Sequence, residues 1–183
     1  MKATDEHGSL VDIEDCYISI PELDSKDRKA KITMRILPDI SDSKGANYSD
    51  ESGIGRSFPI KNYSYSENRT ISWNIHLMVC KEGDQEDILR QIKLLEACVY
   101  PSNSKQPYSP PPICRIKCGR LLAEDELCCV LKSYSIKFPT EVVWDDIGYV
   151  PYKLDIDLSF EVVYDSKKLP YAEDIQFLGT NVS

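Results

Sequence analysis

The chain has 183 residues, enough for one domain with a full hydrophobic core. Its 42% hydrophobic and 28% charged residues are ordinary for a globular protein, and its net charge of -8 argues against a protein that wraps nucleic acid with a basic face. No apolar run reaches the roughly 20 residues of a membrane helix. Residues 1–11 form a polar arm without the apolar core of a signal peptide, so we expect folding in a reducing cytoplasm and no membrane partner.

Short alternating segments come first along the chain. Residues 16–20 predict a short strand that ends at a proline, and residues 31–37 alternate until another proline closes them. Residues 39–57 are rich in Ser, Asp, Gly and Asn, which indicates a long loop or the tip of an extended hairpin. A structureless loop of that length in a compact domain is usually functional or disordered. Residues 58–65 then lead into the main strand.

A long strand that runs directly into an amphipathic helix is the most informative feature. Over residues 69–80 apolar residues fall at alternate positions from Ile71, the pattern of a strand with one buried face. Asp84 is a candidate helix N-cap, and the acidic residues after it suit the first turn of a helix. Apolar residues then recur at helical spacing, so we expect a helix over residues 84–100. A loop rich in tyrosine and proline follows it.

Three further strands complete the expected sheet. Residues 113–118 alternate, and the segment stops at Gly119. Residues 153–164 alternate most cleanly, with one apolar and one wet face, as antiparallel sheets do. Residues 127–138 are less regular, and one face of that strand is expected to carry Cys128, Val130, Tyr134, Ile136 and Phe138.

These elements predict a mainly β (α+β) protein. We expect one domain over residues 12–165, with the polar arm before it and a polar tail over residues 166–183. The core should combine the alternating strands with the helix. Its predicted members are Trp73, Leu77, Ile92, Leu95, Ile156, Leu158 and Phe160.

The cysteines are expected to be reduced and free of metal. Their number is odd, most lie in apolar periodic segments, and buried free thiols behave as small hydrophobic groups. Zinc is the alternative, because Cys114 and Cys118 are four apart and Cys128 adjoins Cys129. The C-x-x-C spacing of zinc knuckles is missing, however. The seven are Cys16, Cys80, Cys98, Cys114, Cys118, Cys128 and Cys129.

The sequence contains none of the common catalytic motifs. Phosphate-binding, dinucleotide-binding, zinc-protease and nucleophile-elbow patterns are all missing, so we expect neither an enzyme nor a cofactor. Asp155, Asp157 and Glu161 form a row of carboxylates that reads as a solvated strand face. The alternative is a divalent-cation site and a metal-assisted hydrolase that uses Asp155 and Asp157. An all-β module that binds a small ligand also stays open.

The order of the elements resembles the tail-tube fold of contractile phage tails and related injection machines, and most of all their baseplate tube-initiator proteins. In that family a long strand precedes a helix that leads to a Tyr-Pro loop. After the loop comes a strand that is preceded by prolines and followed by glycine. The last strand has alternating apolar and polar residues. The cysteine-rich strands depart from the pattern. The resembling segments are residues 57–60, 69–79, 87–95, 99–101, 111–119, 130–136 and 154–161.

The resemblance implies a structural virion protein with an antiparallel β-barrel or sandwich and one flanking helix. Such subunits form a homohexameric ring at the baseplate, beside hub and tail-tube proteins, around a channel that DNA passes without sticking. Residues 39–57 would be the inter-subunit segment, with Ser41, Gly45, Tyr48, Gly53 and Gly55 as candidate contacts. Asp155, Asp157 and Glu161 would form an acidic channel or surface face, which repels phosphate. A baseplate or neck adaptor outside the channel is the alternative.

Overall fold

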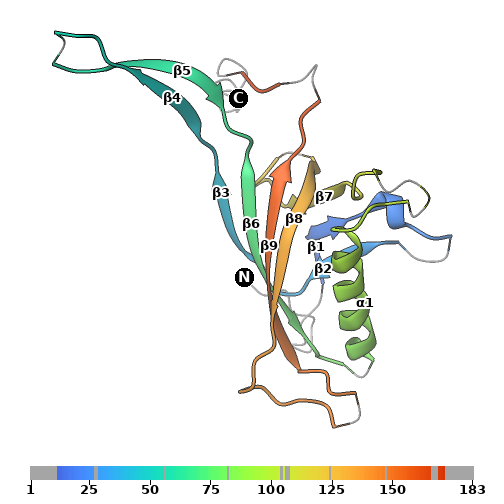
Figure 1. Cartoon of the computed structure of the whole chain (residues 1–183). Coiled ribbons are helices and arrows are strands. Elements are labelled where there is room, and N and C mark those ends of the chain that lie inside the picture. Colours follow the sequence, from blue (N-terminus) through green and yellow to red (C-terminus); the bar gives the residue numbers. More distant parts are fainter. Residues whose placement is uncertain are drawn as a thin grey trace, which may run out of the picture.

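Strands dominate the computed structural model of the chain (Figure 1). The structure describes residues 12–171, apart from residues 27–28, 56, 82, 104, 106–107, 124, 147 and 166–168. The predicted arm, and all of the predicted tail except residues 169–171, lie outside the described residues. In the described part the strands are β1 (Ile13–Ser19), β2 (Lys31–Met34), β3 (Asp39–Ser43), β4 (Ala46–Glu51), β5 (Ile60–Ser66), β6 (Thr70–Met78), β7 (Cys114–Cys118), β8 (Leu127–Lys137) and β9 (Lys153–Val162).

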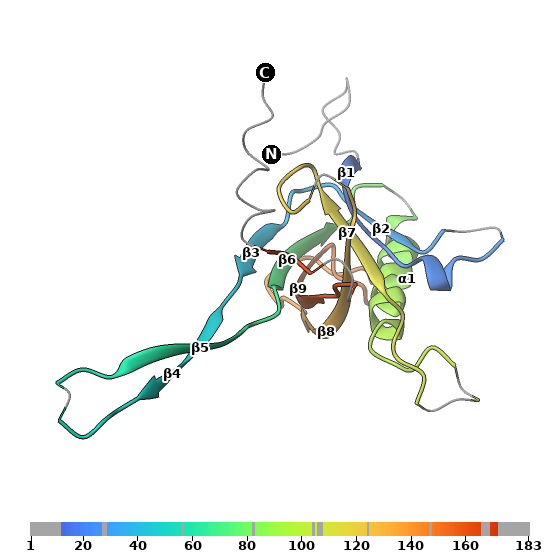
Figure 2. The ribbon, with the colours of Figure 1, turned by 90° about the horizontal axis from the view of Figure 1, so that it is seen from above.

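Helical structure is limited to α1 (Asp84–Ala97) and the short 3-10 helix η1 (Pro21–Leu23) in the described residues. The helix α1 lies beside β1, β2 and β7 in both ribbon views (Figures 1 and 2). It ends three residues before the predicted end, and Val99 and Tyr100 already belong to the turn that follows. No helix in the described ranges is long and apolar enough to cross a bilayer.

The main sheet is antiparallel throughout, with the strand order β2-β1-β7-β8-β9-β6-β3. Its two edge strands, β2 and β3, are consecutive in the chain and are joined by residues 35–38 alone. A connection of that length spans at most about 17 Å when fully extended. The sheet therefore curls until its edges approach each other, as the view from above shows (Figure 2). This confirms the predicted class, mainly β with one flanking helix, although the described strands do not close into a full barrel.

One hydrophobic core fills the inside of the curled sheet. In β9 burial alternates with every residue, so the local sequence pattern alone placed this strand correctly. The rings of Trp73 in β6 and Phe160 in β9 meet edge to face, with centroids 6.0 Å apart. The predicted core residues are buried, with one exception. Ile92 is only half-buried and packs against the core from α1.

The predicted inward face of β8 is wrong in the first half of the strand. Cys128 is exposed, whereas Cys129 and Leu131 are buried. The cause is a β-bulge, because Leu131 pairs with Phe160 while Ser133 pairs with the very next residue of β9, Ser159. One extra residue in β8 reverses the alternation. Beyond the bulge the prediction agrees with the structure for Tyr134 and Ile136, which pack against the core. It is wrong for Phe138, which lies past the end of the strand and is exposed.

Candidate assembly surfaces

A two-stranded ribbon projects from the domain where β3 and β6 leave the main sheet (Figure 1). It consists of β4 and β5, which in the described part of the chain pair only with each other. Every residue of β5 is exposed, and every residue of β4 but one. Two-stranded hairpins are marginally stable alone in water. We refer to residues 46–66 as the ribbon, and both of its faces are open for contact with another molecule.

Aromatic side chains cover the faces of the ribbon. Tyr48 and Tyr63 lie directly opposite each other, with ring centroids 5.8 Å apart, and stay 55% and 59% exposed. Beside them Lys61 Nζ lies 2.6 Å from Asp50 Oδ1. Tyr65 is exposed on the other face. Tyrosine combines a large apolar ring with a hydroxyl, and it is enriched at protein interfaces for that reason.

The residues proposed for the inter-subunit segment are distributed along this projection. Ser41 lies in β3 and belongs to the main sheet, whereas Tyr48 lies in β4. Gly45 lies between β3 and β4, where its carbonyl accepts a hydrogen bond of 2.8 Å from the amide of Glu67. Gly53 and Gly55 lie in the tip between β4 and β5, and Gly55 has a φ of 89°. The structure thus brings four of them into the projection, and it separates Ser41 from it.

An ion pair fixes the root of the projection. The guanidinium group of Arg69 donates to both carboxylate oxygens of Asp42, at 2.9 and 2.7 Å, and to the carbonyl of Leu122 at 3.1 Å. The hydrogen bonds from Arg69 hold the pKa of Asp42 below its ordinary value. Bidentate pairs of this kind combine energy with a defined orientation. Sequence reasoning did not find this clamp, because the two residues are 27 positions apart.

Small polar side chains cover the outer face of β3, β6, β9 and β8. Strand register places Ser41, Ser72, Ser159 and Ser133 side by side in one row across the four strands. The next row consists of Asp39, Asn74, Asp157 and Ser135. Both rows line a shallow depression of about 500 Å³. We refer to these eight residues as the serine face.

The predicted row of carboxylates runs along β9 and shares Asp157 with the serine face. Each member of the row has a basic partner. Asp155 lies 2.5 Å from His76 Nδ1, Asp157 lies 2.8 Å from Lys137 Nζ, and Glu161 lies 2.9 Å from Lys132 Nζ. The pKa of Asp157 is lowered, first by its hydrogen bond to Lys137, and that of Glu161 is lowered, first by Asn68.

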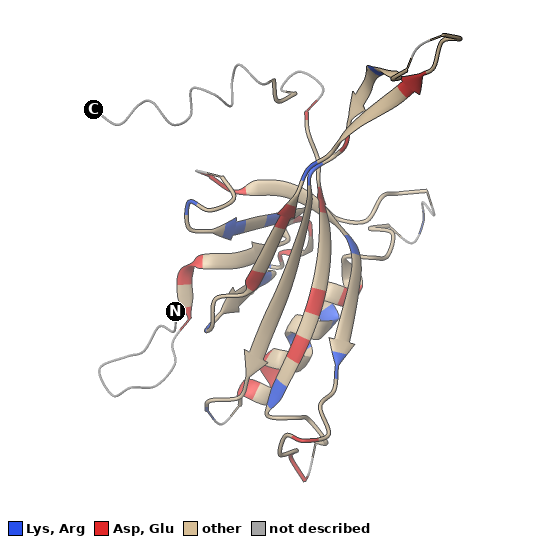
Figure 3. Ribbon diagram, turned by 90° about the vertical axis from the view of Figure 1, so that its left-hand side faces the viewer, with Lys and Arg blue, Asp and Glu red and all other residues tan. Residues whose placement is uncertain are grey.

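Successive outward positions on a strand are about 6.7 Å apart, too far for one metal ion to join three such carboxylates. Within the described ranges no three His, Cys, Asp or Glu residues converge on a site for a metal ion. Acidic segments on β9 lie beside a strand that carries basic segments (Figure 3). The row is therefore a charge-balanced ladder.

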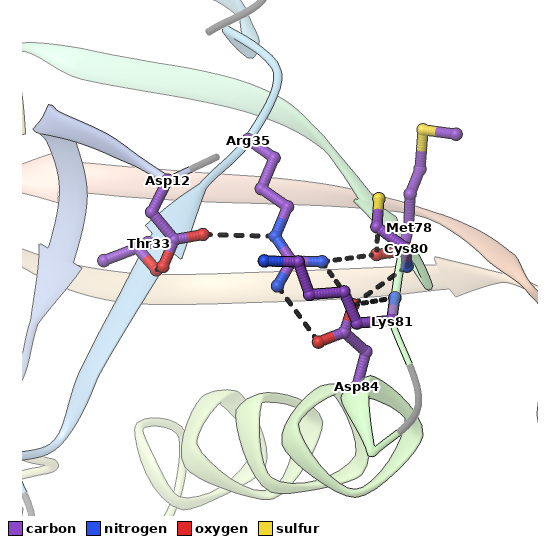
Figure 4. Close-up of polar contacts among 7 residues, drawn as sticks. All are labelled: Asp12, Thr33, Arg35, Met78, Cys80, Lys81 and Asp84. Carbon is purple, nitrogen blue, oxygen red and sulfur yellow. Dashed lines mark hydrogen bonds and ion pairs between the residues drawn. The ribbon is translucent and has the colours of Figure 1, made fainter. Parts of the chain in front are cut away.

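A half-buried ion pair links the edge of the sheet to the start of α1 (Figure 4). Arg35, just after β2, donates to both oxygens of Asp84, and it also donates to Asp12 at 3.2 Å. Asp84 is not the N-cap that was predicted. It is the first residue of the helix, after Gly83 with a φ of 93°, and its carboxylate accepts the amides of Cys80 and Lys81 at 2.8 and 2.9 Å. These bonds hold the pKa of Asp84 far below its ordinary value, with Arg35 as the largest cause.

A second exposed apolar region lies at the end of the molecule opposite to the ribbon, in the loop between β8 and β9 (Figure 1). Hydrogen bonds order this loop, including one from Trp144 Nε1 to the carbonyl of Pro139 at 3.1 Å and one from the amide of Tyr152 to the carbonyl of Val143 at 3.0 Å. Its exposed apolar side chains are Phe138, Val143, Tyr149 and Tyr152.

Comparisons with known proteins add little to this description. No family model matches the chain, and no curated protein matches it. Among solved structures, it is similar to a chain of one described as "Tail of empty GTA particle computed with helical refinement, C6 symmetry". The similarity covers 89% of this chain and 96% of that chain, at 12% sequence identity and a TM-score of 0.37. A likeness this distant does not decide fold or function.

Proposed function

We propose that this chain is a structural protein of a contractile, phage-like tail, where it forms a ring of the tail tube at the baseplate. The observation that carries the proposal is the ribbon. It exposes both faces, with tyrosines on each of them, and the described part of the chain offers nothing to cover them. A neighbouring subunit would bury these side chains and stabilise a hairpin that is marginal alone.

The geometry of such a contact favours a ring. The ribbon projects from one end of the domain and would lie on a different surface of the next copy, so the contact is heterologous. Heterologous contacts produce a closed ring when the rotation between neighbours closes, and a filament when it does not. Together with the order of elements along the chain, this supports a ring. We propose that the ring has six copies and meets hub and tail-tube proteins at its two ends.

The serine face suits the wall of a channel that DNA traverses. Its side chains are short, and of its two carboxylates, Asp39 and Asp157, the second is paired with Lys137. A wall of this kind lacks the unpaired lysines and arginines that hold phosphate groups. DNA would be a transient passenger in this arrangement. The ladder of Asp155, Asp157 and Glu161 would then contribute local charge balance rather than strong repulsion.

A reconstruction of the intact particle by electron cryomicroscopy tests the proposal. We expect density for this chain in the ring that begins the tube, with β3, β6, β9 and β8 toward the lumen and the ribbon on a neighbouring subunit. Density for the chain outside the tube, with the serine face away from the channel, would refute the tube assignment and support the adaptor alternative. Purified chain is a weaker test, because a ring that needs a template can dissociate in solution.

A further inference from the structure

Two thiols from distant parts of the sequence lie in contact inside the protein. Cys16 in β1 and Cys118 in β7 are partners in the strand register, and their sulfur atoms are 3.7 Å apart. In the neighbouring register pair, the amide of Gly119 donates to the carbonyl of Asp15 at 2.8 Å. Asp15 and Gly119 are therefore a hydrogen-bonded pair of the antiparallel ladder, and such pairs alternate with non-hydrogen-bonded ones. Cys16 and Cys118 are therefore a non-hydrogen-bonded pair, in which the Cα atoms are about 4.5 Å apart. That separation lies within the range of disulfides.

The other buried cysteines lie deeper in the protein. Cys114 and Cys129 are also register partners, across β7 and β8. The thiol of Cys129, however, points to the carbonyl of Cys114 at 3.6 Å, and the thiol of Cys98 donates to the carbonyl of Leu94 at 3.1 Å. All three side chains are fully buried. The thiols of Cys98 and Cys114 also share a hydrogen bond, which lowers the pKa of Cys114. Because both of these thiols are fully buried, partial exposure of one sulfur is what distinguishes the pair of Cys16 and Cys118.

Access from solvent decides which thiol of the pair reacts first. Cys118 is 8% exposed, at the end of β7 before the turn at Gly119, whereas Cys16 is 1% exposed. Burial, followed by the proximity of Cys118, raises the pKa of Cys16 to about 12. Because the thiolate is the reactive form, Cys118 is the group that meets an external oxidant.

We propose that Cys16 and Cys118 are a modification site at which a low-molecular-weight disulfide, such as oxidised glutathione, closes a covalent bond between β1 and β7. The thiolate of Cys118 attacks one sulfur of the oxidant and displaces a thiolate, which gives a mixed disulfide. The thiolate of Cys16 then attacks the sulfur of Cys118 and displaces the second thiolate. The two cysteines lose two electrons and two protons, and the oxidant gains both and leaves as two thiols.

The bond would join residues that are 102 positions apart in the chain. Closing so long a loop restricts the unfolded chain and stabilises the fold, most of all at β1. In a reducing compartment the pair stays open, and in an oxidising medium it closes. The inference does not depend on ring assembly, because it rests on the interior of one subunit.

Peptide mapping of the full-length chain tests this site. The protein is incubated with reduced or with oxidised glutathione, acid-quenched, alkylated while denatured, and digested with trypsin. Cleavage after Lys117 and Arg120 releases residues 118–120, and cleavage after Lys2 and Lys26 releases residues 3–26. After oxidation we expect these two peptides to be linked, with the loss of two hydrogen atoms. The thermal unfolding midpoint should rise, and a reductant should reverse the rise.

Matched variants separate this pair from the exposed thiols. Cys16→Ser and Cys118→Ser should each lose both the linked peptide and the rise in the midpoint, whereas Cys80→Ser, at an exposed cysteine, should keep both. If the variants of the pair fold poorly, the peptide map of the native chain decides alone. The proposal would be overturned by recovery of Cys16 and Cys118 as alkylated thiols after oxidation. A bridge from Cys114 to Cys98 or to Cys129 in place of theirs would overturn it as well.

Discussion

The guanidinium group of Arg35 contacts both carboxylate oxygens of Asp84, although 49 residues separate the two in the chain. The side chains are 24% and 11% exposed, so solvent screens the pair only weakly. This ion pair, together with the amides of Cys80 and Lys81, fixes the start of α1 against the edge of the sheet (Figure 4). It is the main polar connection between these elements in the described residues.

Removing the charge of Asp84 should therefore destabilise the fold. In Asp84→Asn the shape is nearly unchanged, but the half-buried Arg35 keeps only Asp12, which is 53% exposed, as an acidic partner. We expect the free energy of unfolding, measured with urea, to fall by about 2 kcal/mol. Glu96→Gln breaks an exposed pair with Lys93 on the same helix and should have a much smaller effect. Equal effects of the two substitutions would contradict this account.

The same pair predicts a dependence on pH with a definite sign. The pKa of Asp84 is lower in the folded chain than in the unfolded chain, where it is ordinary. Its contribution to stability is therefore complete above the unfolded pKa and is lost as the pH falls through the folded pKa. The advantage of the wild type over Asp84→Asn should be constant near neutral pH and shrink below roughly pH 4. Urea titrations at several pH values measure the difference in the free energy of unfolding between the two proteins. A difference that grew in acid would contradict the prediction.

The contact between Trp73 and Phe160 gives a prediction for the core. Phe160→Ala removes a fully buried ring that packs on Trp73 from the opposite strand. We expect a loss of about 3–5 kcal/mol in the free energy of unfolding, because the cavity cannot close completely. Phe138→Ala is the matched control, since this ring is 56% exposed past the end of β8, and it should change stability little. Near wild-type stability for Phe160→Ala would show that the ring of Phe160 is not packed in the core against Trp73.

The sequence predicts those features of the structure that depend on residues close together in the chain. The two faces of β9 follow from its alternation alone, because neighbouring residues on a strand point to opposite sides. The bulge in β8 was missed, since a single extra residue leaves no mark in a pattern of residue types. The strand after residue 31 was predicted too long, because the pairing of Arg35 with Asp84 lies outside any local window. These features depend on strand register and on contacts between distant segments.

In the candidate site, too, local patterns were predicted and contacts between distant segments were not. The composition of residues 39–57 indicated either a loop or a hairpin tip, and the structure has strands there, paired with residues that follow the segment. Serines at alternate positions are visible in the sequence. Their alignment as Ser41, Ser72, Ser159 and Ser133 requires the register of four strands. The carboxylates of β9 were found, but the lysines that balance them come mainly from β8, so the row was expected to be more acidic than it is.

The tyrosines of the ribbon give the most direct prediction for assembly. Tyr48 and Tyr63 contact each other but pack on nothing in the core, so the double variant Tyr48→Ser with Tyr63→Ser should leave the thermal midpoint of the isolated chain almost unchanged. In the assembled ring these rings would be covered by a neighbour, and each would contribute a large apolar contact. We therefore expect the double variant to lose incorporation into particles.

Incorporation is measured by expressing the variants in a strain that lacks the native gene, purifying particles, and quantifying this chain by mass spectrometry against a capsid or sheath protein. Tyr108→Ser is the matched control, because Tyr108 is 98% exposed in the loop after α1 and lies outside the ribbon. It should be incorporated like the wild type. Normal incorporation of the double variant would show that the ribbon is not an inter-subunit contact. Such a result would remove the observation on which the ring proposal rests, even though the folded domain would be intact.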